Sequence, residues 1–278
     1  MSSQRLYLIG LPRFERDDKP IELNSAKAVA LLAYLCVARA PQARDHLLAL
    51  LWAESAPDPA RKNLRNTLWM IRKSLSDDVL QSSDDHLTIP PQVWVDIHEF
   101  ERLADLSPTI ENLQSAIALY RGAFLEGLVV AEAPEFELWL TAERERLAQL
   151  HLHLLGALVG AHRAEGDWRQ VIGTARRALA HDDLQEPMHR ALMEAHARLG
   201  ERAEALRQYD ALQATLAREL GVEPLSETQA LRAAIIGGAF DQPSSAPAAV
   251  APRMPKRPPI LVLLRDFVLL RDFKVIHS

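Results

Sequence analysis

The stretch PARKNLRNTLWMIRKSL, residues 59–75, decides how the fold of this chain is interpreted. It carries five basic residues and no acidic residue, although the whole chain of 278 residues has a net charge of -5. Four apolar residues recur at the spacing of a buried helical stripe, namely Leu64, Leu68, Ile71 and Leu75. At about 100° per residue, most of the basic side chains project from the other side. The pattern predicts an amphipathic helix that packs by its leucines and exposes a basic face.

The exposed face of this predicted helix has the residue types that read DNA. Asn66 is able to make a bidentate bond to an adenine edge, and lysine and arginine suit phosphates or guanine. Arg44 lies in the first turn of a shorter predicted helix, RDHLLALLW, upstream. The predicted DNA-binding surface has seven members: Arg44, Lys62, Arg65, Asn66, Trp69, Arg72 and Lys73.

The segments around the basic helix complete a winged helix-turn-helix. Upstream, LYLIGLPRFERDDKPIEL predicts two or three short antiparallel strands with a turn at Asp17 and Asp18. Asn24 or Ser25 is the predicted cap of a buried helix, AKAVALLAYLCVA. Downstream, HLTIPPQVWVDI alternates apolar and polar residues around a Pro-Pro break and predicts a hairpin. Strands, three helices and a hairpin follow one another in the order of a winged helix.

Residues 99–240 are acidic, with 14 basic and 22 acidic side chains, and they contain an internal repeat. Gly166 and Gly200 lie 34 residues apart. Four further pairs match at the same offset: Leu158 with Leu192, Ala161 with Ala195, His162 with His196, and Ala178 with Leu212. This is the period of the tetratricopeptide repeat, a helix-turn-helix unit in which the glycine marks the turn. A further helix pair is predicted upstream, at 113–128 and 135–162.

Other patterns argue against chemistry at a metal or a catalytic site. His151 and His153 point about 200° apart on a helix, so they do not share a face, and no metal site is expected. The sequence has no Gly-rich phosphate loop and no favoured Ser-His-Asp or Cys-His pairing, so we expect neither an enzyme nor a cofactor. Cys36, the single cysteine, lies in an apolar run and is expected in the core.

The N-terminus lacks the basic-then-apolar pattern of a secretion signal, and charges interrupt the apolar tail. We expect a cytoplasmic protein with no membrane contact. The predicted fold class is mainly α: a winged-helix domain at 1–98 and an all-α tetratricopeptide-like domain at 99–240. A Pro-rich linker is predicted at 241–259 and a short tail at 260–278. The tail fits either a docking segment or a truncated or altered reading frame.

Three segments, ARDHLLALLW, NLRNTLWMIRKSL and VWVDIHEFERL, resemble the winged-helix domain of the bacterial activators called SARPs, the Streptomyces antibiotic regulatory proteins. That domain is of the kind used by OmpR-type response regulators. Two further segments, ALYRGAFLEGL and RELGVEPLSETQAL, resemble the bacterial transcriptional activator domain that follows it in SARPs. The resemblance covers about residues 5–240. The family motif reads roughly Ser-Arg-Leu-Arg-Arg-Ala-Leu, from which Trp69 and Met70 depart while Arg72 and Lys73 match.

The resemblance implies a transcriptional activator whose winged helix reads double-stranded promoter DNA. It also implies that the helical repeats form a homodimer and contact partners, RNA polymerase among them. The competing hypothesis is a tetratricopeptide-type interaction scaffold without promoter-specific DNA binding. Met70 and the zero net charge of residues 1–98 keep that alternative open.

Overall fold

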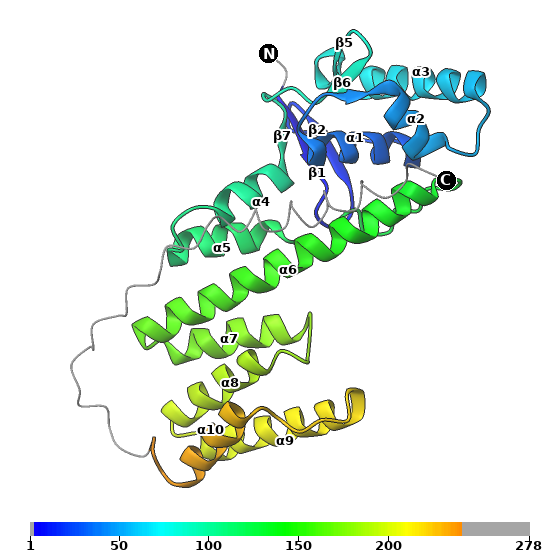
Figure 1. Ribbon diagram of the computed structural model, residues 1–278. Coiled ribbons are helices and arrows are strands. Elements are labelled where there is room, and N and C mark those ends of the chain that lie inside the picture. Colours follow the sequence, from blue (N-terminus) through cyan, green and yellow to red (C-terminus); the bar gives the residue numbers. More distant parts are fainter. Residues whose placement is uncertain (1–2, 241–278) are drawn as a thin grey trace. The chain divides into compact units, whose positions relative to one another are not determined.

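The computed structural model describes residues 3–240, which form two compact units (Figure 1). Within the described residues, the first unit consists of 3–104 and 115–150, and the second of 105–114 and 151–240. No helix within residues 3–240 is long and apolar enough to cross a membrane. The predicted linker at 241–259 and the predicted tail at 260–278 lie outside the described residues.

The N-terminal residues contribute to a four-stranded sheet. Its strands, in spatial order, are β3 (Lys19–Ile21), β2 (Arg13–Arg16), β1 (Gln4–Tyr7) and β7 (Trp94–Val95). The first three pair antiparallel, whereas β7 pairs parallel with β1. Asp17 and Asp18 have φ angles of 53° and 59°, as the tight turn of a two-residue hairpin requires. The predicted strands and their turn are confirmed.

Three helices follow: α1 (Ala26–Ala38), α2 (Arg44–Trp52) and α3 (Pro57–Ser74). The Ser25 hydroxyl accepts a hydrogen bond from the Ala28 N–H at 3.3 Å and caps α1, as predicted. Helix α3 begins before the quoted stretch because Pro57 occupies its first position, where a missing N–H costs no hydrogen bond. Cys36 is fully buried in α1, and this burial raises the pKa of its thiol. Its predicted place in the core is confirmed.

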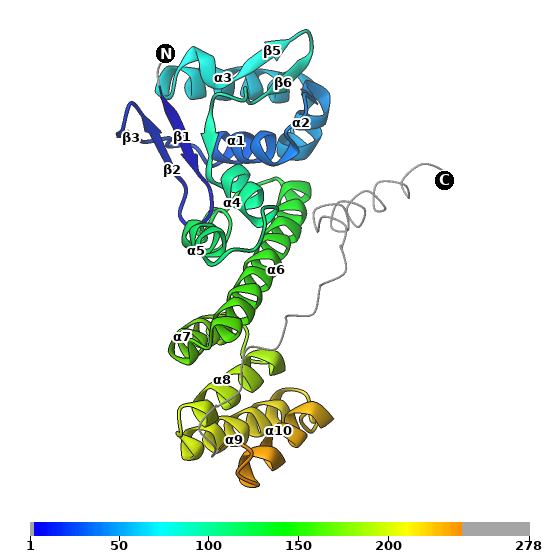
Figure 2. The ribbon, with the colours of Figure 1, turned by 90° about the vertical axis from the view of Figure 1, so that its left-hand side faces the viewer.

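The hairpin after α3 lies earlier in the chain than predicted. β5 (Gln81–Ser83) and β6 (His86–Thr88) pair antiparallel around Asp84, whose φ angle is 49°. The prediction of one hairpin within HLTIPPQVWVDI is wrong, because its two ends join different sheets: β6 also pairs with β4 (Gln42–Ala43), and β7 pairs with β1. The Pro-Pro pair has no N–H for a ladder, whereas adjacent aspartates favour a turn. Figures 1 and 2 show the β5–β6 hairpin, called the wing below, beside α3.

The rest of the described chain is helical: α4 (Asp96–Ala104), α5 (Ile110–Leu119), α6 (Pro134–Glu165), α7 (Trp168–Leu179), α8 (Glu186–Arg198), α9 (Arg202–Glu219) and α10 (Ser226–Ile236). The described residues are therefore mainly α-helical, as predicted. The helices expected at 113–128 and 135–162 correspond to α5 and α6, although α5 already ends at Leu119. Helix α6 contributes its residues up to Leu150 to the first unit and the others to the second.

The compact units divide the chain elsewhere than the predicted domain boundary between residues 98 and 99. The Trp139 ring of α6 lies 5.0 Å from the Tyr34 ring of α1, and Phe100 of α4 is fully buried. Both of these helices therefore supply part of the core of the first unit. A fragment that ended at residue 98 would lack that part. The division into domains at 1–98 and 99–240 stays a prediction.

The second unit contains the predicted helical repeat. Gly166 and Gly200 have φ angles of 74° and 78° and follow the ends of α6 and α8. Each helix ends in the same way, because the N–H of the residue after the glycine, Asp167 or Glu201, returns to the His162 carbonyl at 3.0 Å or to the His196 carbonyl at 2.8 Å. Helix α7 packs on α8, and α8 packs on α9, as Figure 2 also shows. The predicted 34-residue unit is confirmed.

Most of the matched repeat positions have the same burial. The buried members are Leu158 and Leu192, Ala178 and Leu212, and His162 and His196. The alanine pair differs, because Ala195 is fully buried whereas Ala161 is half-buried. The histidines differ in hydrogen bonding: His196 Nδ1 lies 2.6 Å from Glu201 Oε2, whereas both ring nitrogens of His162 have no hydrogen-bond partner within residues 3–240.

Candidate nucleic-acid interface

Helix α3 is held to its unit by the predicted apolar stripe. Leu64, Leu68 and Ile71 are at most 3% exposed, and Leu75, which follows the helix, is fully buried. The Leu75 N–H returns to the Ile71 carbonyl at 2.9 Å, and Arg16 donates to the Leu75 carbonyl at 3.0 Å. Four buried side chains of this size supply several kcal/mol of hydrophobic stabilisation, at roughly 1.5–3 kcal/mol each. The stripe therefore fixes which face of α3 looks outward.

The outward face has the predicted composition. Its exposed members are Lys62, Arg65, Asn66, Trp69 and Lys73, and the Trp69 side chain is exposed to 62%. Arg44 and Arg72 are half-buried. The side chains of Lys62, Arg65 and Asn66 make no hydrogen bond or ion pair with any other described residue. These three side chains are therefore free to meet a ligand without breaking an internal contact.

Five of the seven predicted residues line one pocket of about 550 Å³, together with Leu68 and Asp77. The five are Arg44, Arg65, Trp69, Arg72 and Lys73. The Lys73 ammonium lies 4.7 Å from the centre of the Trp69 ring, which is a cation–π distance. Lys62 and Asn66 lie on the same face of α3 but outside this pocket. The pocket thus offers an aromatic surface beside four cations, a combination suited to a sugar-phosphate backbone.

Two of the arginines also position the wing. The Arg72 Nη2 donates to the Ser82 hydroxyl of β5 at 2.8 Å. The backbone N–H of Arg44 donates to the Asp85 carbonyl at 2.9 Å, and its guanidinium lies 3.6 Å from the Asp85 carboxylate. Arg44 therefore joins the start of α2 to the wing, and Arg72 joins the last turn of α3 to it. The sequence analysis did not identify Ser82 or Asp85, because neither belongs to the helical pattern that revealed the basic face.

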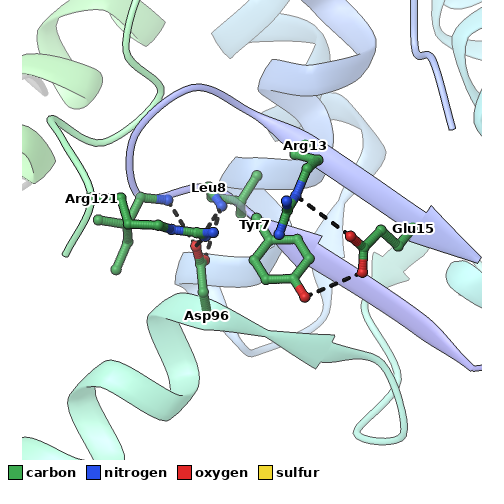
Figure 3. A network of polar contacts seen from close by, with 7 residues as sticks. Tyr7, Leu8, Arg13, Glu15, Asp96 and Arg121 are labelled. Atoms are coloured by element: carbon green, nitrogen blue, oxygen red, sulfur yellow. Dashed lines mark hydrogen bonds and ion pairs between the residues drawn. The ribbon is translucent and has the colours of Figure 1, made fainter. Parts of the chain in front are cut away.

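A second polar cluster in the same unit was also not predicted (Figure 3). The Asp96 carboxylate, fully buried at the start of α4, accepts hydrogen bonds from the N–H groups of Leu8 at 2.9 Å and Ile9 at 3.0 Å. Arg121 Nη2 lies 3.4 Å from the same carboxylate. Burial raises the pKa of Asp96, and these donors oppose the shift by stabilising the charged form. The carboxylate therefore joins β1 to α4.

The ring of Tyr7 lies beside this cluster. The guanidinium carbons of Arg13 and Arg121 lie 4.1 Å and 4.7 Å from its centre, so two cations flank one aromatic ring (Figure 3). The Tyr7 hydroxyl donates to Glu15 Oε2 at 3.2 Å, and the Trp94 ring lies 5.1 Å away. These contacts join the side chains of β1, β2 and β7 in the four-stranded sheet.

A family profile named bacterial transcriptional activator domain matches residues 95–236, which is half of the chain. The chain belongs to this family. Among curated proteins it is similar to the regulatory protein AfsR of Streptomyces coelicolor, with 28% identity over 241 residues that cover 84% of this chain and 24% of AfsR. It is also similar to the transcriptional regulatory protein MoaR1 of Mycobacterium tuberculosis, with 26% identity over 76% of this chain and 72% of MoaR1.

The family and its regulators confirm the predicted kinship with SARP-type transcriptional activators, and these relatives are regulators rather than enzymes. The chain spans about a quarter of the length of AfsR. Among solved structures it is similar to Mycobacterium tuberculosis EmbR, determined in complex with a low-affinity phosphopeptide. The TM-score is 0.67 at 24% identity, over 88% of this chain and 67% of EmbR, which shows a shared fold.

Proposed function

We propose that this chain is a sequence-specific transcriptional activator that reads double-stranded promoter DNA by placing α3 in the major groove. The observation that carries the proposal is the outward face of α3 from residue 62 to residue 73, which bears Lys62, Arg65, Asn66, Trp69 and Lys73 and no acid. The acid of the first turn of α3, Asp58, lies 3.7 Å from the Arg61 guanidinium. A groove lined by phosphates repels carboxylates, so a helix that enters it carries bases on its outer face. The wing beside α3 and membership of an activator-domain family support the same assignment.

The residues of this face have different roles in the proposal. Asn66, whose amide is exposed and free, reads an adenine edge. Lys62, Arg65 and Lys73 contact phosphates or guanine, and Trp69 covers a sugar or a thymine methyl group. Arg44 and Arg72 hold the wing and present their remaining donors to the DNA backbone. The wing then contacts the backbone beside the groove.

The helical repeats have the second role in the proposal, namely to join two protomers on one promoter and to contact RNA polymerase in the cytoplasm. Net negative charge in residues 99–240 supports protein contacts over DNA contacts there. Analytical ultracentrifugation of the full chain with promoter fragments that carry one or two half-sites tests this role. Two protomers on the two-site fragment, bound cooperatively, are expected. Independent binding at the two sites would remove assembly from the proposed function.

The decisive experiment measures DNA affinity against salt for two substitutions on α3. Lys73→Ala should weaken binding to all sequences alike and reduce the slope of log affinity against log salt by roughly one unit. Asn66→Ala should leave the slope unchanged and reduce discrimination at one base pair by roughly 1–3 kcal/mol. Arg218→Ala, which removes an exposed cation from α9, is the matched charge control and should change neither quantity.

The assay is fluorescence anisotropy with promoter fragments from the neighbourhood of the gene, in the full chain. If Lys73→Ala and Asn66→Ala both leave affinity, discrimination and the salt slope unchanged, α3 is not the recognition helix. The interaction-scaffold hypothesis would then be the better explanation of the chain.

A further inference from the structure

The outward face of α7 carries three arginines without acids among them. Arg169, Arg176 and Arg177 are exposed, as is Gly173 between them. At 100° per residue these four positions fall within a sector of about 100°. The buried residues of α7 lie on the opposite side: Val171, Thr174, Ala175 and Ala178. We call these four residues, Arg169, Gly173, Arg176 and Arg177, the α7 face. It lies in a unit whose described residues carry ten arginines, no lysine and fourteen carboxylates.

The three arginines differ from all others in this unit. The remaining seven arginines each contact a carboxylate, a carbonyl or an aromatic ring within the chain: Arg163, Arg190, Arg198, Arg202, Arg207, Arg218 and Arg232. Arg169, Arg176 and Arg177 make no hydrogen bond, ion pair or cation–π contact with any residue between 3 and 240, although Arg176 adds, after Arg207, to the lowered pKa of Glu204. In an acidic unit, cations without a direct internal contact are available to an external anion.

Comparison of the two repeats shows that the fold does not need these arginines. At the offset of 34 residues, Arg169, Arg176 and Arg177 correspond to Ala203, Asp210 and Ala211 on α9. Helix α9 packs in the same repeat arrangement with a face that has no net charge, and its Arg207 is paired with Glu204. The basic face of α7 is therefore specific to the first repeat, and the packing of the repeat helices does not require it.

Gly173 is a second, independent observation at this face. Glycine is unfavourable inside a helix, and here it does not make room for another part of the protein, because a Cβ at Gly173 would meet nothing within 4 Å. The missing side chain instead leaves the backbone of α7 open between the arginines. A partner segment can approach it closely and place carboxylates within reach of cations on either side.

We propose that the α7 face is a docking surface for an acidic segment of a partner protein. The proposal rests on the part of the proposed function that assigns partner contacts to the helical repeats. Two-fold pairing of α7 with α7 of a second copy would bring like charges together, which is destabilising. The net charge of -4 on the described residues of this unit repels a DNA duplex at long range. A carboxylate of a partner segment, by contrast, can accept two parallel hydrogen bonds from one arginine guanidinium.

The test measures binding of fluorescently labelled poly-L-glutamate to the full chain and to two variants. One variant, R169A/R176D/R177A, gives α7 the residues of the second repeat and should fold with unchanged circular dichroism. The other, K62A/R65A/K73A, neutralises the α3 face and serves as the matched control. We expect the α7 variant to bind poly-L-glutamate on the order of tenfold more weakly, given the modest contribution of each exposed ion pair. Its affinity for promoter DNA should be unchanged.

Each outcome discriminates between hypotheses. Equal poly-L-glutamate affinity of the α7 variant and the unaltered chain would overturn the proposal. A loss of DNA affinity in the α7 variant would also overturn it, and would make nucleic acid the partner of this face. A loss of DNA binding only in the α3 variant concerns the proposed function and leaves the α7 proposal standing. Hydrogen exchange of the unaltered chain is the second measurement: poly-L-glutamate should slow exchange in α7, and unchanged exchange there would refute docking even if the variant failed to fold.

Discussion

The substitution Asp96→Ala tests whether one buried carboxylate holds the first unit together. It leaves the buried N–H groups of Leu8 and Ile9 without the oxygens that accept from them. Each buried donor without a partner costs about 1–3 kcal/mol, so the two together cost roughly 2–6 kcal/mol. Removing a carboxylate whose pKa is raised by burial offsets part of this cost. We therefore expect the free energy of unfolding to fall by about 2–3 kcal/mol.

Urea unfolding followed by tryptophan fluorescence measures this change. Four of the five tryptophans lie in the first unit, namely Trp52, Trp69, Trp94 and Trp139, so the signal reports mainly on that unit. Asp96→Asn keeps one acceptor oxygen and should lose less stability than Asp96→Ala. Glu145→Ala, which removes an exposed carboxylate of α6 that accepts a hydrogen bond from Gln149, should change the free energy by less than about 0.5 kcal/mol. An equally small effect of Asp96→Ala would refute the role assigned to the buried carboxylate.

Three further substitutions test the second unit. Ala195→Phe should overpack the fully buried site between the repeat helices and cost roughly 1–3 kcal/mol, and an unchanged thermal melt would contradict that packing. Burial, assisted by the charges of His181 and Arg177, lowers the pKa of His151 to about 4. As the pH falls below 6.5, the His151 ring therefore gains a proton in the unfolded chain before it does so in the folded chain. The stability that follows from the lowered pKa is present above pH 6.5 and is lost toward pH 4; urea titrations over this range should show a flatter pH dependence for His151→Leu than for the unaltered chain. Gly173→Ala meets open space and should raise the free energy of unfolding by about 0.5–1 kcal/mol in the same titrations, whereas a loss would mean that the helix needs glycine there.

The parts of the fold that local chemistry determines could be predicted from the sequence. Ser25 caps α1 because its hydroxyl reaches an N–H three residues ahead, and the two repeat glycines adopt positive φ angles that other residues avoid. The stripe on α3 is likewise a property of 3.6-residue periodicity. Strand partners are not local: the parallel pairing of β7 with β1 joins residues about ninety positions apart, and no spacing within β7 indicates it.

The candidate site divides in the same way. The seven predicted residues follow from the charge and periodicity of two helices, so the exposure of the five on the outward face of α3 could be anticipated. The pocket that five of the seven line could not be anticipated, because its shape depends on how the two helices pack. The contact of Arg72 with Ser82 could not be anticipated, because it depends on where the wing turns and therefore on Asp84 and Asp85. Asp96 resembles an ordinary first-turn acid in the sequence, and only its burial against β1 reveals its other role.

The double engagement of Arg44 and Arg72 has a consequence for how this protein can evolve. A substitution at either position changes the proposed DNA surface and also removes a side-chain contact with the wing, so selection would act on two properties at once. Lys62, Arg65 and Asn66 hold no other part of the chain within the described residues, and replacing them carries little penalty in folding. If α3 reads promoter DNA as proposed, new promoter preferences should arise at Lys62, Arg65 and Asn66, while the arginines at the wing are retained.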